Sequence, residues 1–324
     1  MDMEAAGQRR QPPWLLTSHG EDNDNHAFYN VAENQLHATT IPELSKKYIY
    51  ASTYGWLVLV DYSGECCIWN PESNEKVELP FLEDPLDYTN CVLSKPPTDP
   101  DCHVLFTSSF CRSFCQVGDD DYWFEEVEAG QGRLTLAVAA FKGQLYGFIG
   151  GRNQFVTVHF VYDTIEYRKI MIEKEGVRQP WRVPRLSASY KTHTEDFMMK
   201  SPCNNELLLV HRMCSTSYRY FDFKVFRLDV TRMEFEELKS IGDRTIFLSS
   251  RSTVECCSCS SSTGIKANCI YYTDLNGRDL YIYDLNDRGK TLLLPCPAAS
   301  RSESMNFWIE HQVAQKLVHQ HEHS

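Results

Sequence analysis

The sequence predicts an all-β fold, a six-bladed β-propeller built from four-stranded antiparallel blades. Three observations predict it: a repeated hairpin, a repeated strand ahead of each hairpin, and a further strand ahead of five of these units. The hairpin is clearest in "LYIYDLNDRGKTLLLP", which begins at Leu280 and alternates large apolar and polar residues around a turn rich in Asp and Gly. Alternation of period two is what a half-buried antiparallel pair requires, and the polar break supplies the turn.

Each element of the repeat can be placed along the chain. The six hairpins begin at Ala27, Cys66, Phe114, His159, Val225 and Leu280. The apolar strand ahead of each begins at Trp14, Trp56, His103, Gln144, Glu206 and Cys269. The further strand begins at Tyr48, Cys91, Leu136, Asp196 and Thr245. Four antiparallel strands in roughly 40–45 residues is the period of a propeller blade.

The first unit lacks its leading strand, and "NFWIE" (residues 306–310) is the remaining candidate for it. We therefore expect the ring to be closed by three N-terminal strands plus one C-terminal strand, which leaves no open sheet edge. The expected organisation is a disordered N-terminus (1–13), the propeller (14–311) and a polar tail (312–324). A β-sandwich or two barrels also give short strands at even spacing, but neither requires six similar units.

Composition narrows the classes of partner. The net charge is -12 and the pI is about 5.4, with no Lys/Arg-rich block, which argues against nucleic-acid binding. No apolar stretch approaches the ~20 residues of a membrane helix, and the first residues do not resemble a secretory signal. The 13 cysteines are then expected to be free thiols in a reducing compartment, which predicts a cytoplasmic and/or nuclear protein without a membrane partner.

The motifs that could carry chemistry are better explained by structure. "ECCSC" (residues 255–259) and "CRSFC" (residues 111–115) could be imagined as zinc-ligand pairs, but adjacent cysteines on a strand point to opposite faces. The ending "HQHEHS" (residues 319–324) is interpreted as a polar tail. The chain has no phosphate-binding loop, no G-x-S-x-G and no dinucleotide fingerprint, and its predicted leading strands nearly lack carboxylates and histidines. We therefore expect no enzyme activity, no catalytic residue, no metal and no cofactor.

Three segments resemble a known plant family. They are "YGWLVLVDYSGECCIWNPESNEKVELP", "FKVFRLDVTRMEFEELKSIGDRTIFLS" and "GIKANCIYYTD". They resemble the F-box-associated β-propeller family called KIB-type, for kink suppressed in bikinin. The resemblance implies a propeller that holds a protein substrate, behind an N-terminal F-box that docks into a ubiquitin ligase.

Only 13 residues precede the first predicted strand at Trp14, so we expect no F-box in this chain. The predicted function is a non-enzymatic protein-interaction propeller whose partner is unknown. The alternative is a substrate receptor of an SCF-type ubiquitin ligase, with the F-box missing through truncation or supplied by a partner. Ubiquitin-ligase components would then be among its partners.

Within "IGDR" (residues 241–244), the structural interpretation is favoured over a ligand contact. Gly242 and Asp243 can form the turn into the leading strand, and Arg244 could pair with an acid of the neighbouring blade.

The long connection of residues 173–194, "EKEGVRQPWRVPRLSASYKTHT", has a local charge of +3 inside this acidic chain. A second connection, Met213–Tyr220, follows on the expected same face of the propeller. Trp, Tyr and Arg dominate interface hot spots. The predicted partner-binding residues are Arg178, Trp181, Arg182, Arg185, Tyr218 and Arg219. The alternative is an insertion whose aromatic residue covers a blade edge.

Overall fold

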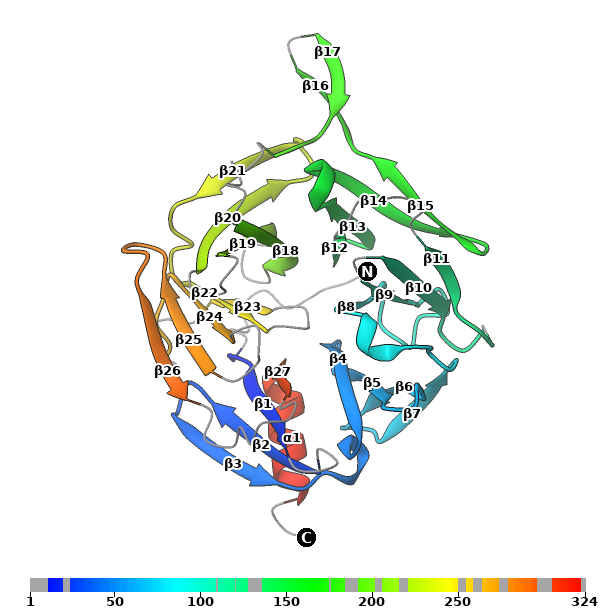
Figure 1. The fold of residues 1–324 in the computed structure, drawn as a ribbon, viewed down its shortest axis with the longest axis vertical. Coiled ribbons are helices and arrows are strands. Elements are labelled where there is room, and N and C mark those ends of the chain that lie inside the picture. Colours follow the sequence, from blue (N-terminus) through cyan, green and yellow to red (C-terminus); the bar gives the residue numbers. More distant parts are fainter. Residues whose placement is uncertain are drawn as a thin grey trace.

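The structure is a computed structural model of the chain. It describes residues 11–19, 24–108, 110–119, 121–127, 136–174, 176–183, 192–201, 206–215, 221–249, 255–258, 264–273, 279–295 and 305–321. Six sheets stand around a central axis, which confirms the six-bladed β-propeller (Figure 1). In the first blade β27 (Met305–Ile309) is innermost, and β1 (Trp14–His19), β2 (Asn25–Asn30) and β3 (Gln35–Thr39) follow outward.

The next four blades each contain four consecutive antiparallel strands. Their bounds are β4 (Lys47–Thr53), β5 (Trp56–Asp61), β6 (Cys66–Asn70) and β7 (Glu75–Leu79); β8 (Asn90–Leu93), β9 (His103–Thr107), β10 (Cys111–Gln116) and β11 (Phe124–Val127); β12 (Leu136–Phe141), β13 (Gln144–Ile149), β14 (Gln154–Val161) and β15 (Thr164–Lys169); β18 (Thr192–Ser201), β19 (Glu206–Ser215), β20 (Phe221–Asp229) and β21 (Glu234–Leu238). Three short 3-10 helices lie in connections: η1 (Pro42–Leu44), η2 (Pro85–Asp87) and η3 (Gly150–Arg152).

The sixth blade has one strand more than the repeat predicts. Its order from the channel outward is β23 (Glu255–Ser258), β22 (Arg244–Leu248), β24 (Cys269–Thr273), β25 (Asp279–Asp284) and β26 (Lys290–Pro295). Because β23 pairs antiparallel with the inner edge of β22, the chain has already reversed before it reaches β24. As a result β22 and β24 run parallel, the one departure from antiparallel pairing within the six blades described.

The ring closes as predicted, by a C-terminal strand beside three N-terminal strands. β27 pairs antiparallel with β1, with Leu15 opposite Trp308. The Trp308 indole N–H donates to the Leu248 carbonyl at 3.1 Å, which ties the closing blade to the sixth. Closure of this kind removes the sheet edges that an open ring would expose.

Six apolar clusters fill the six junctions between neighbouring blades. Successive side chains of a strand point to opposite faces, so each inner strand contributes to two junctions. Leu15 packs between the sixth and first blades, whereas Leu16 packs between the first and second. Both faces of the inner strands are therefore covered, which explains why "WLVLV" (residues 56–60) is apolar throughout rather than alternating.

The segment expected to be a polar tail contains a helix that packs on the ring. Helix α1 (His311–His321) buries Val313, Ala314, Leu317 and Val318 in the cluster between the first and second blades. These positions share one face of a helix, and the histidines that made the segment look polar occupy other positions. Residues 1–10 of the predicted disordered N-terminus lie outside the described residues.

The structural interpretation of "IGDR" is confirmed. Gly242 has a φ of +70°, a conformation that favours glycine, at the turn between β21 and β22. The Arg244 guanidinium lies 2.8 Å from the Glu206 carboxylate of the preceding blade and donates to the Ile241 carbonyl. Arg244 is buried, so this ion pair joins two blades in a largely desolvated junction.

Candidate protein-interaction surface

An arm of two strands projects from the rim of the ring. The connection between β15 and β18 contains β16 (Met171–Lys174) and β17 (Val177–Pro180), which pair only with each other (Figure 1). Gly176, with a φ of +75°, lies in the turn between them. The sequence predicts a long connection over residues 173–194. Residues 173–174 and 177–180 of it lie in this hairpin, which has a defined register, and residues 192–194 already belong to β18 (Thr192–Ser201).

Trp181 anchors the arm to the fourth blade. Its indole is 1% exposed and packs on the Phe155 ring at a centroid distance of 4.4 Å. The backbone N–H of Trp181 donates to the Ile170 carbonyl at 2.7 Å, and the backbone carbonyl of Trp181 accepts from the Phe155 N–H at 3.0 Å. Trp181 therefore belongs to the core. This placement agrees with the alternative interpretation, in which the aromatic residue of the connection covers a blade edge. It does not support a direct contact between Trp181 and a partner.

The other predicted interface residues divide into two groups. Arg178 lies on β17 opposite Glu173, and Arg182 follows the anchor; both are exposed. Arg185, Tyr218 and Arg219 lie outside the described residues. The structure thus brings Arg178, Trp181 and Arg182 together at one arm, and the partner-binding role of the arginines stays a prediction.

Sequence reasoning missed two charged pairs on β18 and β19. The Asp196 carboxylate contacts His211 Nδ1, and the Glu195 carboxylate contacts Arg212; both pairs are directly opposite in the register. The predicted strand began at Asp196, but β18 begins at Thr192, so Glu195 was assigned to the preceding loop and its pairing with Arg212 was not expected. The two β-branched threonines in "THTED" are a local signal that favours a longer strand.

The geometry of His211 limits what this pair can do chemically. Its ring lies edge-on between Phe148 and Phe226, at centroid distances of 5.5 and 5.2 Å, and its side chain is 3% exposed. A general base must reach the proton that it abstracts, within hydrogen-bond distance of a bound substrate. The aromatic rings occupy that position, so the pair links strands across the sheet rather than presenting a base to solvent.

Several buried cysteines among the described residues are free thiols whose pKa is raised by burial. Burial raises the pKa of the Cys102 thiol to about 11 and that of Cys214 to about 12. A thiol is nucleophilic as the thiolate, so a raised pKa makes it inert near neutral pH. Cys111 and Cys115 lie on β10 of the third blade, whereas Cys256 and Cys257 lie on β23 of the sixth blade, so these four residues are not brought together; Cys259 lies outside the described residues.

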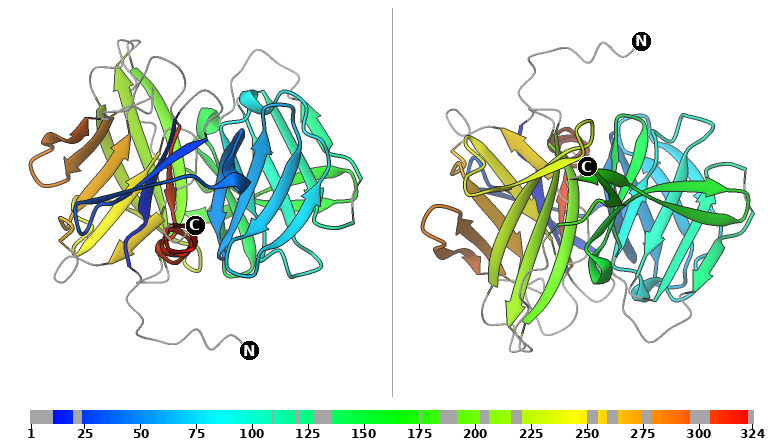
Figure 2. Two further views of the ribbon diagram at one scale, coloured as in Figure 1. Left: turned by 90° about the horizontal axis from the view of Figure 1, so that it is seen from below. Right: turned by 90° about the horizontal axis from the view of Figure 1, so that it is seen from above.

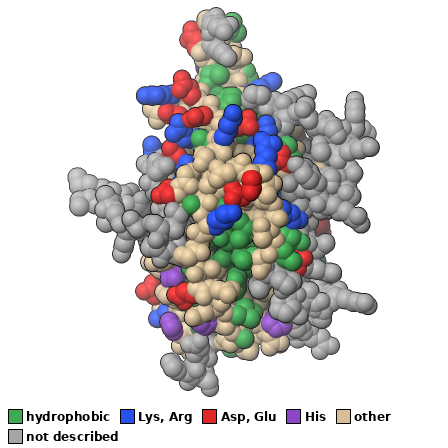
Figure 3. Space-filling view, turned by 90° about the vertical axis from the view of Figure 1, so that its left-hand side faces the viewer, with side chains coloured by type: hydrophobic (Ala, Val, Ile, Leu, Met, Phe, Trp, Pro, Cys, Tyr) green, Lys and Arg blue, Asp and Glu red, His purple; other side chains and the backbone are tan. Residues whose placement is uncertain are grey.

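The outer side of the ring carries paired charges of both signs. Figure 3 shows Lys and Arg interspersed with Asp and Glu on the side of the ring that includes β21, β25 and β26. Arg227 contacts both Glu206 and Glu236, and Lys224 contacts Glu237. Exposed pairs of this kind contribute little to the free energy of unfolding.

Within the described residues, no group of three or more His, Cys, Asp or Glu is arranged to hold a metal ion. No helix in the described part of the chain is long and apolar enough to cross a membrane.

A closed ring of six blades, with an arm that Trp181 anchors to the fourth blade, defines a β-propeller scaffold. Residues 28–284 match the KIB1-4 beta-propeller family, and the chain belongs to that family. This match confirms the resemblance drawn from the three sequence segments. It covers the second to fifth blades completely, most of the sixth blade and part of the first, and it includes Arg244 and the arm.

Two relatives from Arabidopsis thaliana extend over most of the chain. One is the F-box/kelch-repeat protein At1g57790, 24% identical over 321 residues, with 92% of this chain and 82% of that protein covered. The other is the F-box protein At3g56470, 24% identical over 274 residues, covering 80% of this chain and 70% of the relative. A crystal structure of a functionally unknown protein from Desulfotomaculum acetoxidans matches 92% of this chain and 89% of its own, at 9% identity and a TM-score of 0.42.

Proposed function

We propose that this chain is a non-enzymatic protein-interaction module, with the β16–β17 arm as a recognition element for a protein partner. The observation that carries the proposal is the arm itself. An isolated two-stranded hairpin is marginally stable in water, and its unpaired edges can template another strand. Here Trp181 holds such a hairpin on the rim of the ring. Its indole is fully buried, and the ring N–H has no hydrogen-bond partner among the described residues, which is unfavourable for folding.

The arm has the chemistry of a contact surface. Val177 is 61% exposed, and the exposed Arg178 follows it on β17. Arginine side chains bind carboxylates with two parallel hydrogen bonds, and an extended partner segment could pair with the free edge of either strand. A protein partner with an extended, acidic segment suits this arrangement best.

Two observations support the non-enzymatic part of the proposal. His211 is enclosed by aromatic rings, and burial raises the pKa values of the described inner thiols. Neither group is poised as a base or a nucleophile at neutral pH. The free thiols also support a reducing compartment, so the proposal places the protein in the cytoplasm and/or the nucleus.

A second candidate function is a substrate receptor of an SCF-type ubiquitin ligase. The names of the two Arabidopsis relatives, both F-box proteins, favour it. The two candidates differ in whether ligase subunits accompany the protein. Affinity purification of the tagged protein from plant tissue, followed by mass spectrometry, separates them: recovery of cullin and adaptor subunits supports the receptor, and partners without those subunits support the interaction module alone.

The arm is tested with the double variant Arg178→Ala/Arg182→Ala. Both side chains are exposed, so the variant should keep the melting temperature of the wild type while losing partner recovery. Arg168→Ala is the matched control, because Arg168 is exposed on the neighbouring β15 but is not part of the arm. Equal recovery by the wild type and the double variant would refute the role of the arm. Trp181→Ala is unsuitable as a test, since it would open a cavity in the core.

A further inference from the structure

A second surface, distinct from the arm, lies on one face of the propeller over the second and third blades. Strands alternate in direction within these blades, so the β5–β6, β7–β8 and β9–β10 connections emerge on the same face. Four large apolar side chains are exposed there: Tyr62 (44%), Phe81 (58%), Leu86 (50%) and Phe110 (60%). In Figure 2 (left), the cyan coil of η2 in the β7–β8 connection lies on one face of the ring, and the red helix α1 lies towards the other face.

These connections are held together as one rigid surface. The Leu82 N–H donates to the Gly64 carbonyl at 2.8 Å, which joins the β7–β8 connection to the β5–β6 turn. Phe81 covers Gly64 so closely that a Cβ there would lie 2.9 Å from the Phe81 ring. The Asp61 carboxylate accepts the backbone N–H groups of residues 63, 64 and 65 and so locks the turn.

The other end of the β7–β8 connection is fastened to the third blade. The Thr89 N–H donates to the Thr107 carbonyl at 3.0 Å, and the hydroxyl groups of Tyr88 and Ser113 share a hydrogen bond. A surface that is ordered before binding loses less conformational entropy when a partner binds.

The same surface carries uncompensated negative charge. Glu83, Asp84 and Asp87 are exposed within five residues of the β7–β8 connection, and no Lys or Arg among the described residues forms an ion pair with them. Residues 61–65, 80–89 and 108–110 contain no Lys or Arg. This acidic–aromatic surface, defined by the four apolar residues and these three acids, is negative in a protein whose net charge is -12.

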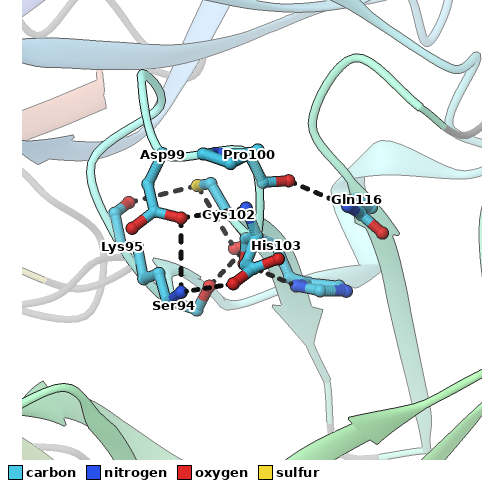
Figure 4. A network of polar contacts seen from close by, with 8 residues as sticks. Ser94, Lys95, Asp99, Pro100, Cys102, His103 and Gln116 are labelled. Atoms are coloured by element: carbon cyan, nitrogen blue, oxygen red, sulfur yellow. Dashed lines mark hydrogen bonds and ion pairs between the residues drawn. The ribbon is translucent and has the colours of Figure 1, made fainter.

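Two acids on the opposite face of the third blade are compensated by a lysine. In the β8–β9 connection, which emerges on the opposite face, Lys95 contacts both Asp99 and Asp101, at 3.2 and 3.0 Å (Figure 4). The Asp99 carboxylate also accepts the Asp101 backbone N–H, which helps to hold its pKa below the usual range. These two acids stabilise their own connection, whereas the acids beside η2 have no such role in the described structure.

We propose that the acidic–aromatic surface binds a basic segment of a partner protein that carries a large apolar anchor residue. This inference rests on the proposed function and specifies the chemistry of a partner. Exposed apolar patches rimmed by polar residues mark interaction sites, and aromatic residues supply the affinity at hot spots. The three carboxylates select for Lys or Arg beside the anchor, and they repel nucleic acids and acidic proteins.

The test is fluorescence anisotropy with a labelled synthetic peptide in which lysines flank leucines. The comparison peptides replace the lysines by glutamate or the leucines by serine. Binding to the wild-type protein should need both residue types and should weaken as salt is added. Equal binding of the glutamate peptide, or no binding of the lysine peptide up to millimolar concentration, would overturn the proposal.

Variants locate the binding on the protein. Phe81→Ala should weaken binding of the lysine peptide about tenfold, and Glu83→Gln/Asp87→Asn should reduce both affinity and salt dependence. The matched control is Tyr162→Ala/Asp163→Asn, an exposed aromatic–acid pair in the β14–β15 turn on the opposite face, which should bind like the wild type. Loss of binding in the control alone, or in no variant, would place the peptide elsewhere and overturn the assignment.

Failure of this inference can be told apart from failure of the proposed function. If the peptide does not bind but the tagged wild-type protein still recovers partners from tissue, only the acidic–aromatic surface is refuted. If the wild-type protein recovers no partner, the interaction function itself fails.

Discussion

Replacing Leu317 by alanine should measurably destabilise the propeller, because α1 is part of the core rather than a tail. Leu317 is fully buried in the cluster between the first and second blades. The substitution removes three carbon groups, worth about 2.4 kcal/mol at ~0.8 kcal/mol per buried methylene. The cavity left behind raises the expected loss in the free energy of unfolding to about 3–4 kcal/mol. For a domain of this size, that corresponds to a fall in melting temperature of roughly 6–15 °C.

The assay is urea unfolding followed by tryptophan fluorescence, together with a thermal melt followed by circular dichroism. Gln312→Ala is the matched control, since Gln312 is exposed on the same helix and its loss should change the free energy of unfolding by less than ~0.5 kcal/mol. A Leu317→Ala variant as stable as the control would refute the packing of α1 on the ring. Equal destabilisation by both variants would show that the loss does not come from the burial of Leu317.

Three further predictions concern the blades. Arg244→Met should lower the free energy of unfolding by about 2–3 kcal/mol in urea titrations, because, of the ion-pair contacts of the Glu206 carboxylate in the described structure, only the one with Arg227 then remains. The double variant Arg244→Met/Glu206→Gln should lose less stability than the sum of the two single variants. Strictly additive losses would contradict the pairing. Gly147→Ala should cost about 1–3 kcal/mol in thermal melts, since the new Cβ would lie 2.9 Å from the Val156 Cγ2; an unchanged melting temperature would contradict this crowding. The pKa of the Cys102 thiol is raised to about 11 in the folded protein, so the thiol loses its proton at a lower pH in the unfolded chain than in the folded one. The free energy of unfolding should therefore fall as the pH rises above about 9. In urea titrations between pH 7 and 10.5, the free energy of unfolding should fall less steeply with pH for Cys102→Ser than for the wild type. The same pH dependence for both proteins would contradict this role of Cys102.

The blades could be predicted from the sequence because their signal is local. Strands β1, β5, β9, β13, β19 and β24 begin at the residues where the sequence places them. The closing strand and the Arg244 contact were also predicted, one from counting strands and one from turn chemistry. The extra strand β23 was not, because its residues pair with an edge that exists only after the sixth blade has formed.

The candidate surfaces were harder to predict. Trp181 has the composition of a hot spot, and it becomes buried only because β14 brings Phe155 beneath it. Phe81 and Leu82 are adjacent and equally apolar in sequence, yet Phe81 is 58% exposed and Leu82 is fully buried. Nothing in the local pattern separates such neighbours in an irregular connection.

The sequence by itself therefore determined the number of blades, the positions of most strands and the closure of the ring. Only the tertiary structure decided the burial of Trp181, the packing of α1 and the exposure of the acidic–aromatic surface. The physical reason is that the alternation of a strand is a property of consecutive residues, and its repetition along the chain makes the pattern detectable in the sequence. The burial of a side chain in a connection depends instead on segments far apart in the chain, which meet only when the ring is complete.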